Sequence, residues 1–195
     1  ILLLRRLIMK KRPFSKKQVL TLRRMLQDHP RDLCLLNVAL DTCLRSSDLL
    51  SLKVETLKSA WGEIRETIQV KMKKTGKMVR CQLSDHTQDS IERWIALTNK
   101  QPGDYLFTSI RGGSKPITGI AYRKIVKGWC RECGWDETFF STHSLRRSLP
   151  SIIYKGSKDV RTCQIILGHD SPASTAHYLG LEEEDAFAVA NQFRI

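Results

Sequence analysis

The stretch Thr142-His143-Ser144-Leu145-Arg146-Arg147 gives the strongest indication of both the fold and the chemistry of this chain. In a helix, His143 and Arg146 stand three residues apart and share one face. Two short motifs follow, Leu167-Gly168-His169 and His177-Tyr178-Leu179-Gly180. A single histidine or tyrosine is more often structural than catalytic. The order and spacing of these motifs therefore matter more than any one of them alone.

Apolar periodicity and capping residues predict helices on both sides of these motifs. Ser15 with Gln18 forms a capping-box signature that opens a helix over roughly 15–27. Another helix runs through 33–40, and Ser47 with Asp48 would cap a short helix that follows it. Ser84 starts a further helix that ends before 102. Later helices are expected at roughly 118–130, 143–154, 158–167, 172–179 and 182–193.

One segment changes period from helix to strand. Residues 66–72 alternate polar and apolar side chains, as a half-buried strand does. Lys74-Thr75-Gly76-Lys77 supplies a turn, and 78–83 can return as the partner strand. The sequence therefore predicts a mainly α fold with a small antiparallel β-sheet, that is, an α+β domain.

Composition points to a polyanionic partner. The chain has 195 residues, with 33 Lys and Arg against 20 Asp and Glu, so the formal net charge is +13. Such a surplus favours nucleic acid or an acidic membrane face. No apolar run approaches the roughly 18–20 residues of a membrane span. Arg5 and Arg6 cut short the apolar opening 1–4 and argue against a secretory signal. We expect a cytoplasmic protein with no membrane partner.

The cysteines predict neither a metal site nor disulfides. Only Cys130 and Cys133 have ligand-like spacing, and no second pair completes a zinc set. We interpret them as an unreactive pair. The remaining cysteines lie in apolar stretches and are expected to be small core residues of a protein in a reducing compartment: Cys34, Cys43, Cys81 and Cys163.

Taken in order, the motifs resemble the tyrosine recombinase family, also called phage integrases. That family has an arginine near the end of an early helix, a lysine in a β-hairpin, His-x-x-Arg, Leu-Gly-His, and a tyrosine about nine residues later. Here 178 − 169 gives that spacing. The resemblance extends from Ser15 into the last helix. The matching catalytic positions are Arg45, Lys74, His143, Arg146, His169 and Tyr178.

The chemistry of phosphodiester cleavage agrees with the resemblance. Negative charge accumulates on the non-bridging oxygens in the transition state, and two arginines, Arg45 and Arg146, can clamp them. Tyr178 would attack phosphorus and give a covalent phosphotyrosyl link. A phenol with a pKa near 10 needs a base or a positive field, for which His143 is the candidate. The family pattern implies a 3′-phosphotyrosine and a free 5′-hydroxyl, with neither metal nor ATP.

The remaining roles follow from the same resemblance. His169 would donate to a phosphate oxygen, and Lys74 on the hairpin would protonate the leaving 5′-oxygen. Neighbouring cations could contact phosphates or carry solvated charge, and we expect Lys73, Lys77 and Arg147 to bind DNA. A structural interpretation stays open for each residue taken singly: Arg45 could satisfy carbonyls at a helix end, and His169 could be a cap.

Two positions depart from the family pattern. Pro150 falls four residues after Arg146 inside the predicted helix, where proline removes one hydrogen bond and costs about 3 kcal/mol if the helix stays straight. A kink there would change the aim of His143 and Arg146. Cys43 stands where the family often has glycine.

The expected organisation is a basic arm over 1–14 followed by a catalytic domain over 15–195. The DNA-clamping domain that most family members carry is not present in this sequence, so the chain is either a single-domain recombinase or has lost an upstream domain. The resemblance implies double-stranded DNA as partner and a tetramer at synapsis. Because the last predicted helix, 182–193, has an apolar face, we expect it to dock on a neighbouring subunit.

Two other functions stay open. One is nicking and closing of DNA in the manner of a type IB topoisomerase, which uses similar residues. The other is DNA binding without catalysis on the same fold, which Pro150 makes worth testing.

Overall fold

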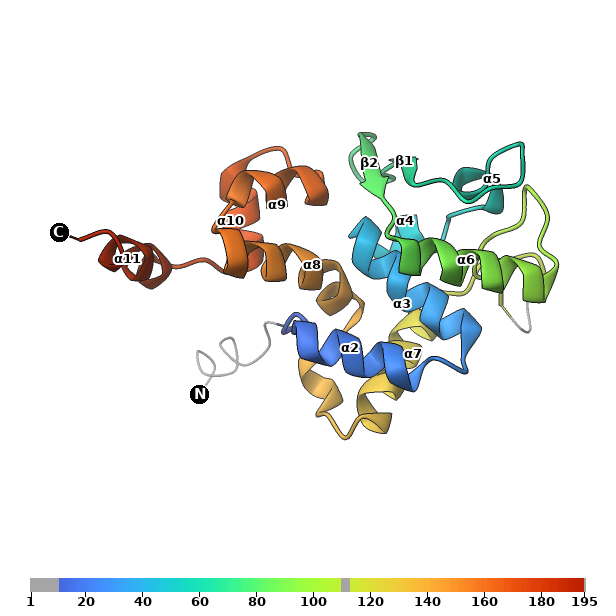
Figure 1. Cartoon of the computed structure of the whole chain (residues 1–195), viewed down its shortest axis with the longest axis horizontal. Coiled ribbons are helices and arrows are strands. Elements are labelled where there is room, and N and C mark those ends of the chain that lie inside the picture. The colour runs from blue at the N-terminus through green and yellow to red at the C-terminus, as the bar shows by residue number, and fades with distance from the viewer. Residues whose placement is uncertain (1–10, 110–112, 195) are drawn as a thin grey trace.

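The computed structural model describes residues 11–109 and 113–194 of the chain. These residues form a group of helices with one two-stranded sheet at the edge of the molecule (Figure 1). The prediction of a mainly α fold with a small antiparallel sheet is therefore confirmed. In chain order the elements are α2 (Lys16–Met25), α3 (Pro30–Thr42), α4 (Ser46–Leu49), α5 (Val54–Leu57), β1 (Thr67–Lys71), β2 (Met78–Gln82), α6 (Asp85–Thr98), α7 (Gly119–Glu132), the 3₁₀ turn η1 (Glu137–Phe139), α8 (Thr142–Ser157), α9 (Val160–Leu167), α10 (Pro172–Leu179) and α11 (Glu183–Asn191).

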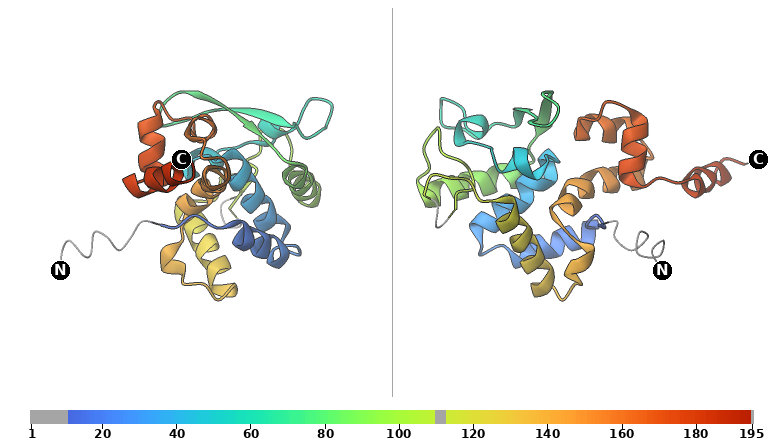
Figure 2. Two further views of the ribbon diagram at one scale, coloured as in Figure 1. Left: turned by 60° about the vertical axis from the view of Figure 1, so that its left-hand side comes forward. Right: turned by 180° about the vertical axis from the view of Figure 1, so that it is seen from behind.

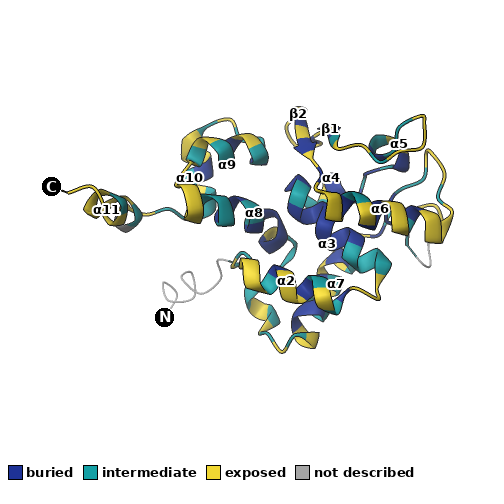
Figure 3. Ribbon diagram, viewed as in Figure 1, coloured by how far each residue is buried: buried dark blue, intermediate teal, exposed yellow. Residues whose placement is uncertain are grey.

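The core is built around α3. This helix is buried almost all round, because residues 34–40 are apolar apart from Asn37, which is buried as well. It packs against α6 on one side and α8 on the other. Figure 3 shows the burial concentrated on α3 and on the parts of its neighbours that face it. The helix that carries the His-x-x-Arg motif is thus fixed to the centre of the molecule.

The predicted hairpin forms, with β1 and β2 inside the expected ranges. Strand β1 pairs with β2 antiparallel, with Ile68 opposite Cys81 and Val70 opposite Val79. These four side chains are buried and their neighbours along each strand are not, as the alternation of the sequence indicates. The turn between the strands contains Gly76 at φ +69°, a left-handed conformation that glycine adopts without strain.

Residues 11–14 already pack against the body of the domain. The ring of Phe14 is buried and stacks on Phe140 at a centroid distance of 4.5 Å. The Phe14 N–H donates to Ser148 Oγ, and the Arg12 N–H donates to the Phe139 carbonyl. The basic arm was expected over 1–14; its first ten positions lie outside the described residues.

Helices α8, α9 and α10 form a lobe that carries both histidine motifs and the tyrosine. Helix α9 packs on α8 and on α10. Helix α8 continues through Pro150, which is buried within it. Beyond α10 the chain leaves the lobe, and α11 extends away from the body, as Figure 1 and the right-hand view of Figure 2 show.

The short helix after α3 begins earlier than expected. Ser47 and Asp48 were predicted to cap it, but Arg45 is its N-cap residue and Asp48 lies inside α4. The reason is that the buried Asp48 carboxylate is used elsewhere: its Oδ1 accepts the backbone N–H of Lys73 at 3.0 Å. Helix α5 has no counterpart in the sequence prediction.

Candidate active site

Helix α8 places Arg146 where three separate segments meet. The side chain is only 4% exposed. Its Nη1 donates to the Cys43 carbonyl at 2.5 Å, and its Nη2 donates to the Leu167 carbonyl at 2.9 Å. The guanidinium therefore ties together the ends of α3 and α9. Of its five N–H donors, these bonds use two and leave three for a phosphate.

Cys43 has the backbone conformation that explains why the family often has glycine there. It closes α3 in the left-handed region, at φ 48° and ψ 27°. A side chain in this conformation is strained by about 1 kcal/mol. The thiol is buried and donates to the Leu40 carbonyl at 3.2 Å. Although it is not glycine, Cys43 adopts the left-handed conformation that directs its carbonyl toward Arg146.

Arg45 lies next to the base of the hairpin. Its Nη1 is 3.1 Å from the sulfur of Met72, a weak acceptor. The bond from the Lys73 N–H to Asp48 fixes the same end of the hairpin to α4. These two contacts, Arg45 with Met72 and Lys73 with Asp48, fix the position of Arg45 relative to the start of the hairpin turn.

Gly168 allows the hairpin to approach the second histidine motif. It caps α9 at φ +64°, and a Cβ at this position would lie 2.7 Å from Val79 Cγ2 and 2.9 Å from Met72 Cε. Both the conformation and the space exclude a side chain. The Leu-Gly-His motif is thus a packing requirement as well as the support of His169.

His169 is oriented by a hydroxyl on the helix of the tyrosine. Its Nδ1 is 3.1 Å from Thr175 Oγ1, and Thr175 is fully buried. Donation to a phosphate oxygen by Nε2 requires Thr175 to donate its proton to Nδ1. The ring of His169 meets the ring of Tyr178 edge-on, with centroids 5.2 Å apart.

Tyr178 lies beside two guanidinium groups. The centre of its ring is 5.8 Å from Cζ of Arg146 and 5.5 Å from Cζ of Arg147. Its hydroxyl is buried and has no hydrogen-bond partner among the described residues. A phosphate cannot reach a buried oxygen, so a role as nucleophile would require the Tyr178 side chain to turn outward from α10.

Burial and positive charge determine the protonation of the cluster. Desolvation, aided by Arg146 and Arg45, lowers the pKa of His169 to about 4. The same causes, with Arg147 added, lower the pKa of His143, although this residue stands at the surface. Both imidazoles are neutral at pH 7, as a base or a neutral donor must be. Burial raises the pKa of Tyr178, and Arg146 and Arg147 oppose that rise.

The structure brings together most of the predicted catalytic residues. Tyr178 is in contact with both Arg146 and His169. Arg45 lies close enough to His143 and His169 for its positive charge to lower the pKa of each. Lys74 stands exposed on the hairpin turn, and the described contacts do not link it to these residues. Thr175 was not among the predicted site residues, although it precedes Tyr178 by three residues and so shares its helix face.

The residues expected to bind DNA differ from one another. Lys73 is exposed. Lys77 forms an ion pair with Asp170. Arg147 is half-buried, and its guanidinium donates to the carbonyls of Lys11 and Leu179. Of the three, Lys73 is thus the one with its side chain free toward solvent among the described contacts.

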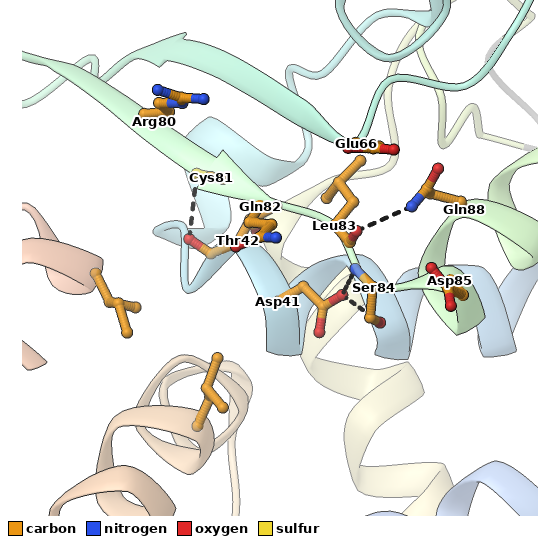
Figure 4. A pocket seen from close by; sticks show the side chains of 12 residues that line it. Asp41, Thr42, Glu66, Arg80, Cys81, Gln82, Leu83, Ser84, Asp85 and Gln88 are labelled. Carbon is orange, nitrogen blue, oxygen red and sulfur yellow. Dashed lines mark hydrogen bonds between the residues drawn. The ribbon is translucent and has the colours of Figure 1, made fainter. Parts of the chain in front are cut away.

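A cavity of about 520 Å³ lies between the sheet and the α8–α9 lobe. Figure 4 shows Asp41 there, accepting from the N–H and hydroxyl of Ser84 at the start of α6. Its described lining contains none of the predicted catalytic residues, so we assign it a structural role.

Within residues 11–109 and 113–194, no cluster of His, Cys, Asp and Glu has the makeup of a metal site. In the same ranges, every helix is too short or too polar for a bilayer span. Burial raises the pKa of Cys133 and takes that of Cys130 to about 12, which fits the expected unreactive pair.

Comparison with known sequences shows similarity along nearly the whole chain. The profile of the phage integrase family matches residues 13–185. The probable integrase/recombinase YoeC of Bacillus subtilis (strain 168) is 28% identical over 172 residues, which cover 87% of this chain and 88% of YoeC. Tyrosine recombinase XerD of Vibrio vulnificus (strain YJ016) is 27% identical over 167 residues, covering 83% of this chain. The chain spans about half the length of XerD (52%).

Solved structures have the same fold. The crystal structure of XerA recombinase superposes with a TM-score of 0.76 at 20% identity, covering 94% of this chain and 65% of XerA. A post-cleavage complex of the XerH site-specific recombinase with its palindromic difH substrate gives a TM-score of 0.74 at 20% identity, covering 91% and 51%.

Proposed function

Since this chain belongs to the phage integrase family, the tyrosine recombinases, which are enzymes of site-specific DNA recombination, we propose that it cleaves and rejoins duplex DNA through Tyr178. The observation that carries the proposal is the meeting of Tyr178, Arg146 and His169, which come from three helix ends. Residues 15–195 would act as the catalytic domain and 1–14 as a basic arm. Because the substrate is DNA, we propose action in the cytoplasm.

The cleavage step balances without an external reagent. A bond forms between the Tyr178 oxygen and phosphorus, and the bond from phosphorus to the 5′-oxygen breaks. The phenolic proton passes to neutral His143, and Lys74 gives a proton to the leaving 5′-oxygen. The products are a 3′-phosphotyrosine and a 5′-hydroxyl, and the reverse sequence rejoins the strand.

The transition state is stabilised by fixed cations. Arg146 keeps three N–H donors for the non-bridging oxygens, while its two carbonyl contacts prevent it from turning away. Arg45 adds a second planar donor, and Nε2 of His169 a third group. Because these donors are held before DNA binds, little reorganisation is needed at the moment of reaction.

A nicked substrate tests this proposal against both alternatives. DNA is taken from the region that flanks the coding sequence, and a nick close to the cleavage site lets the short fragment that bears the free 5′-hydroxyl diffuse away. We expect a covalent complex on a denaturing gel that disappears in Tyr178→Phe. Binding without a covalent complex would favour the non-catalytic protein. Relaxation of supercoiled DNA that lacks any such site would favour the topoisomerase.

We further propose that subunits assemble on DNA through α11. This helix leaves the body, and Phe187 on it and Phe193 just after it are 53% and 77% exposed. An apolar face of this kind is expected to be covered in the working assembly. A neighbouring subunit of the tetramer is the proposed occupant.

A further inference from the structure

Arg147 connects two parts of the chain that are far apart in sequence. Its Nη1 donates to the Lys11 carbonyl at 3.0 Å, and its Nη2 donates to the Leu179 carbonyl at 3.2 Å. Leu179 directly follows Tyr178 and is the last residue of α10. One guanidinium thus bridges the N-terminal segment 11–14 and the end of the helix that carries the nucleophile.

Each end of this bridge is itself anchored. Segment 11–14 is fixed by the Arg12 N–H on Phe139, the Phe14 N–H on Ser148 and the buried Phe14 ring. The end of α10 is closed by N–H donors of Gly180 and Leu181, which both bond to the Ala176 carbonyl. Bonds from a charged donor to carbonyls are stronger than neutral ones. Arg147 therefore limits how far the Tyr178 helix can move from the rest of the domain.

We infer that Arg147 is a positioning residue that couples segment 11–14 to the Tyr178 helix. The inference rests on the proposed function, and it replaces the expectation that Arg147 contacts DNA. The bridge needs a planar group with two separate N–H donors, which lysine does not have. It also holds positive charge 5.5 Å from the phenol ring that must lose its proton.

The test uses Arg147→Gln and Arg147→Lys in the full chain, with Arg93→Gln as the matched control. Arg93 also donates to a backbone carbonyl, that of Gln27 at 3.0 Å, and it stands on α6 away from the site. Thermal unfolding first establishes that each variant is folded. The measurements are DNA affinity at several salt concentrations, the rate of covalent-complex formation at saturating nicked DNA, and amide hydrogen exchange.

We expect both Arg147 variants to bind DNA with the wild-type affinity and salt slope. Their cleavage rate should fall by about tenfold to a hundredfold, because a nucleophile held less firmly spends less time in line. Amides of 11–14 and of 172–181 should exchange faster in both variants. Arg93→Gln should change none of these quantities.

Three results would overturn the inference. One is weaker binding with a salt slope reduced by about one phosphate and an unchanged rate at saturation, which marks a DNA contact. Another is wild-type behaviour of Arg147→Lys, which means that charge alone suffices. The last is unchanged exchange at 11–14. If the wild-type chain itself gives no covalent complex, the proposed function fails, and the exchange data still decide whether the coupling exists.

Discussion

The hairpin turn carries several lysines, and the structure separates them. Lys77 is paired with Asp170, whereas the side chains of Lys73 and Lys74 are exposed. A general acid must approach the 5′-oxygen, so an unpaired lysine at a hairpin tip fits this role better than one already in an ion pair. The turn is held at both ends, by the Lys73 N–H on Asp48 and by the Lys77–Asp170 ion pair, and Lys74 lies between these two points.

Lys74→Ala should therefore slow cleavage, and a better leaving group should correct it. A nicked substrate with sulfur in place of the scissile 5′-oxygen expels a thiolate, whose conjugate acid has a pKa near 8.5 and needs no proton donor. We expect a loss of about a hundredfold or more on normal DNA, within the usual range for general acids, and near wild-type rates on the sulfur substrate. Lys73→Ala is the control and should cleave both substrates alike. A Lys74→Ala defect that persists on the sulfur substrate would assign this lysine to phosphate binding.

His169 links the site to the stability of the fold. Its pKa is about 4 in the folded protein, against 6.5 for an ordinary histidine. Between these values the unfolded chain binds a proton that the folded chain does not, so the free energy of unfolding should fall as the pH drops from 6.5 toward 4. His169→Gln should reduce this fall, as measured by urea unfolding at each pH. His86→Gln, at an exposed histidine on α6, is the control. An equal fall in wild type and His169→Gln would contradict the assignment.

At the scale of the elements, helices and strands that are set by nearby residues could be predicted from the sequence. The capping box of Ser15 and Gln18 and the alternation over 66–72 gave α2 and β1 at nearly their observed limits. Helix α5 was missed because four residues are too few to show a period. Asp48 was predicted to be a helix cap, but its carboxylate accepts a hydrogen bond from Lys73, 25 residues further along the chain. A contact over this separation leaves no local pattern in the sequence.

The candidate catalytic side chains could be proposed from motif order, but the contacts that support them could not. Arg146 and Arg147 are held by carbonyls of Cys43, Leu167, Lys11 and Leu179. Every residue has a carbonyl, so no side-chain pattern in the sequence marks these acceptors.

Pro150 was expected to disturb α8, yet the helix continues through it to Ser157. The absent N–H leaves the Arg146 carbonyl without its usual partner four residues on. The Pro150 carbonyl accepts from the Cys163 thiol at 3.2 Å, and this contact joins α8 to α9. The His-x-x-Arg motif therefore stays on a continuous helix, and the missing hydrogen bond at Pro150 lowers the stability of that helix.

Pro150→Ala should raise the free energy of unfolding by about 1 kcal/mol. Replacing proline with alanine restores about 3 kcal/mol of helix propensity. This gain exceeds the two losses, which are the packing of the buried ring and the larger conformational entropy of the unfolded chain. The midpoint of urea unfolding measures the change, and the cleavage rate should stay the same. Lower stability would mean that the ring packing exceeds the cost to the helix.

At the scale of the whole molecule, the net charge and the packing of the helices have different roles. The net charge of +13 draws the protein to DNA without regard to sequence. Rigid packing around α3 holds the donors of the site. Helix α11 takes no part in either, since it stands clear of the lobe and turns apolar side chains outward. Its contribution is therefore expected only when several subunits share one DNA.

Phe187→Asp combined with Phe193→Asp should abolish assembly and spare the single subunit. Both side chains are more than half exposed, so their loss removes no core packing from the isolated chain. A charged face cannot be buried against a neighbour without a partner, so paired DNA sites should no longer be joined. Native gels and mass photometry of protein–DNA complexes count the subunits, and the nicked substrate reports cleavage at one site. Leu97→Asp, at a leucine of α6 that is 62% exposed, is the matched control. Paired complexes at the wild-type level in the double variant would show that another surface joins the subunits.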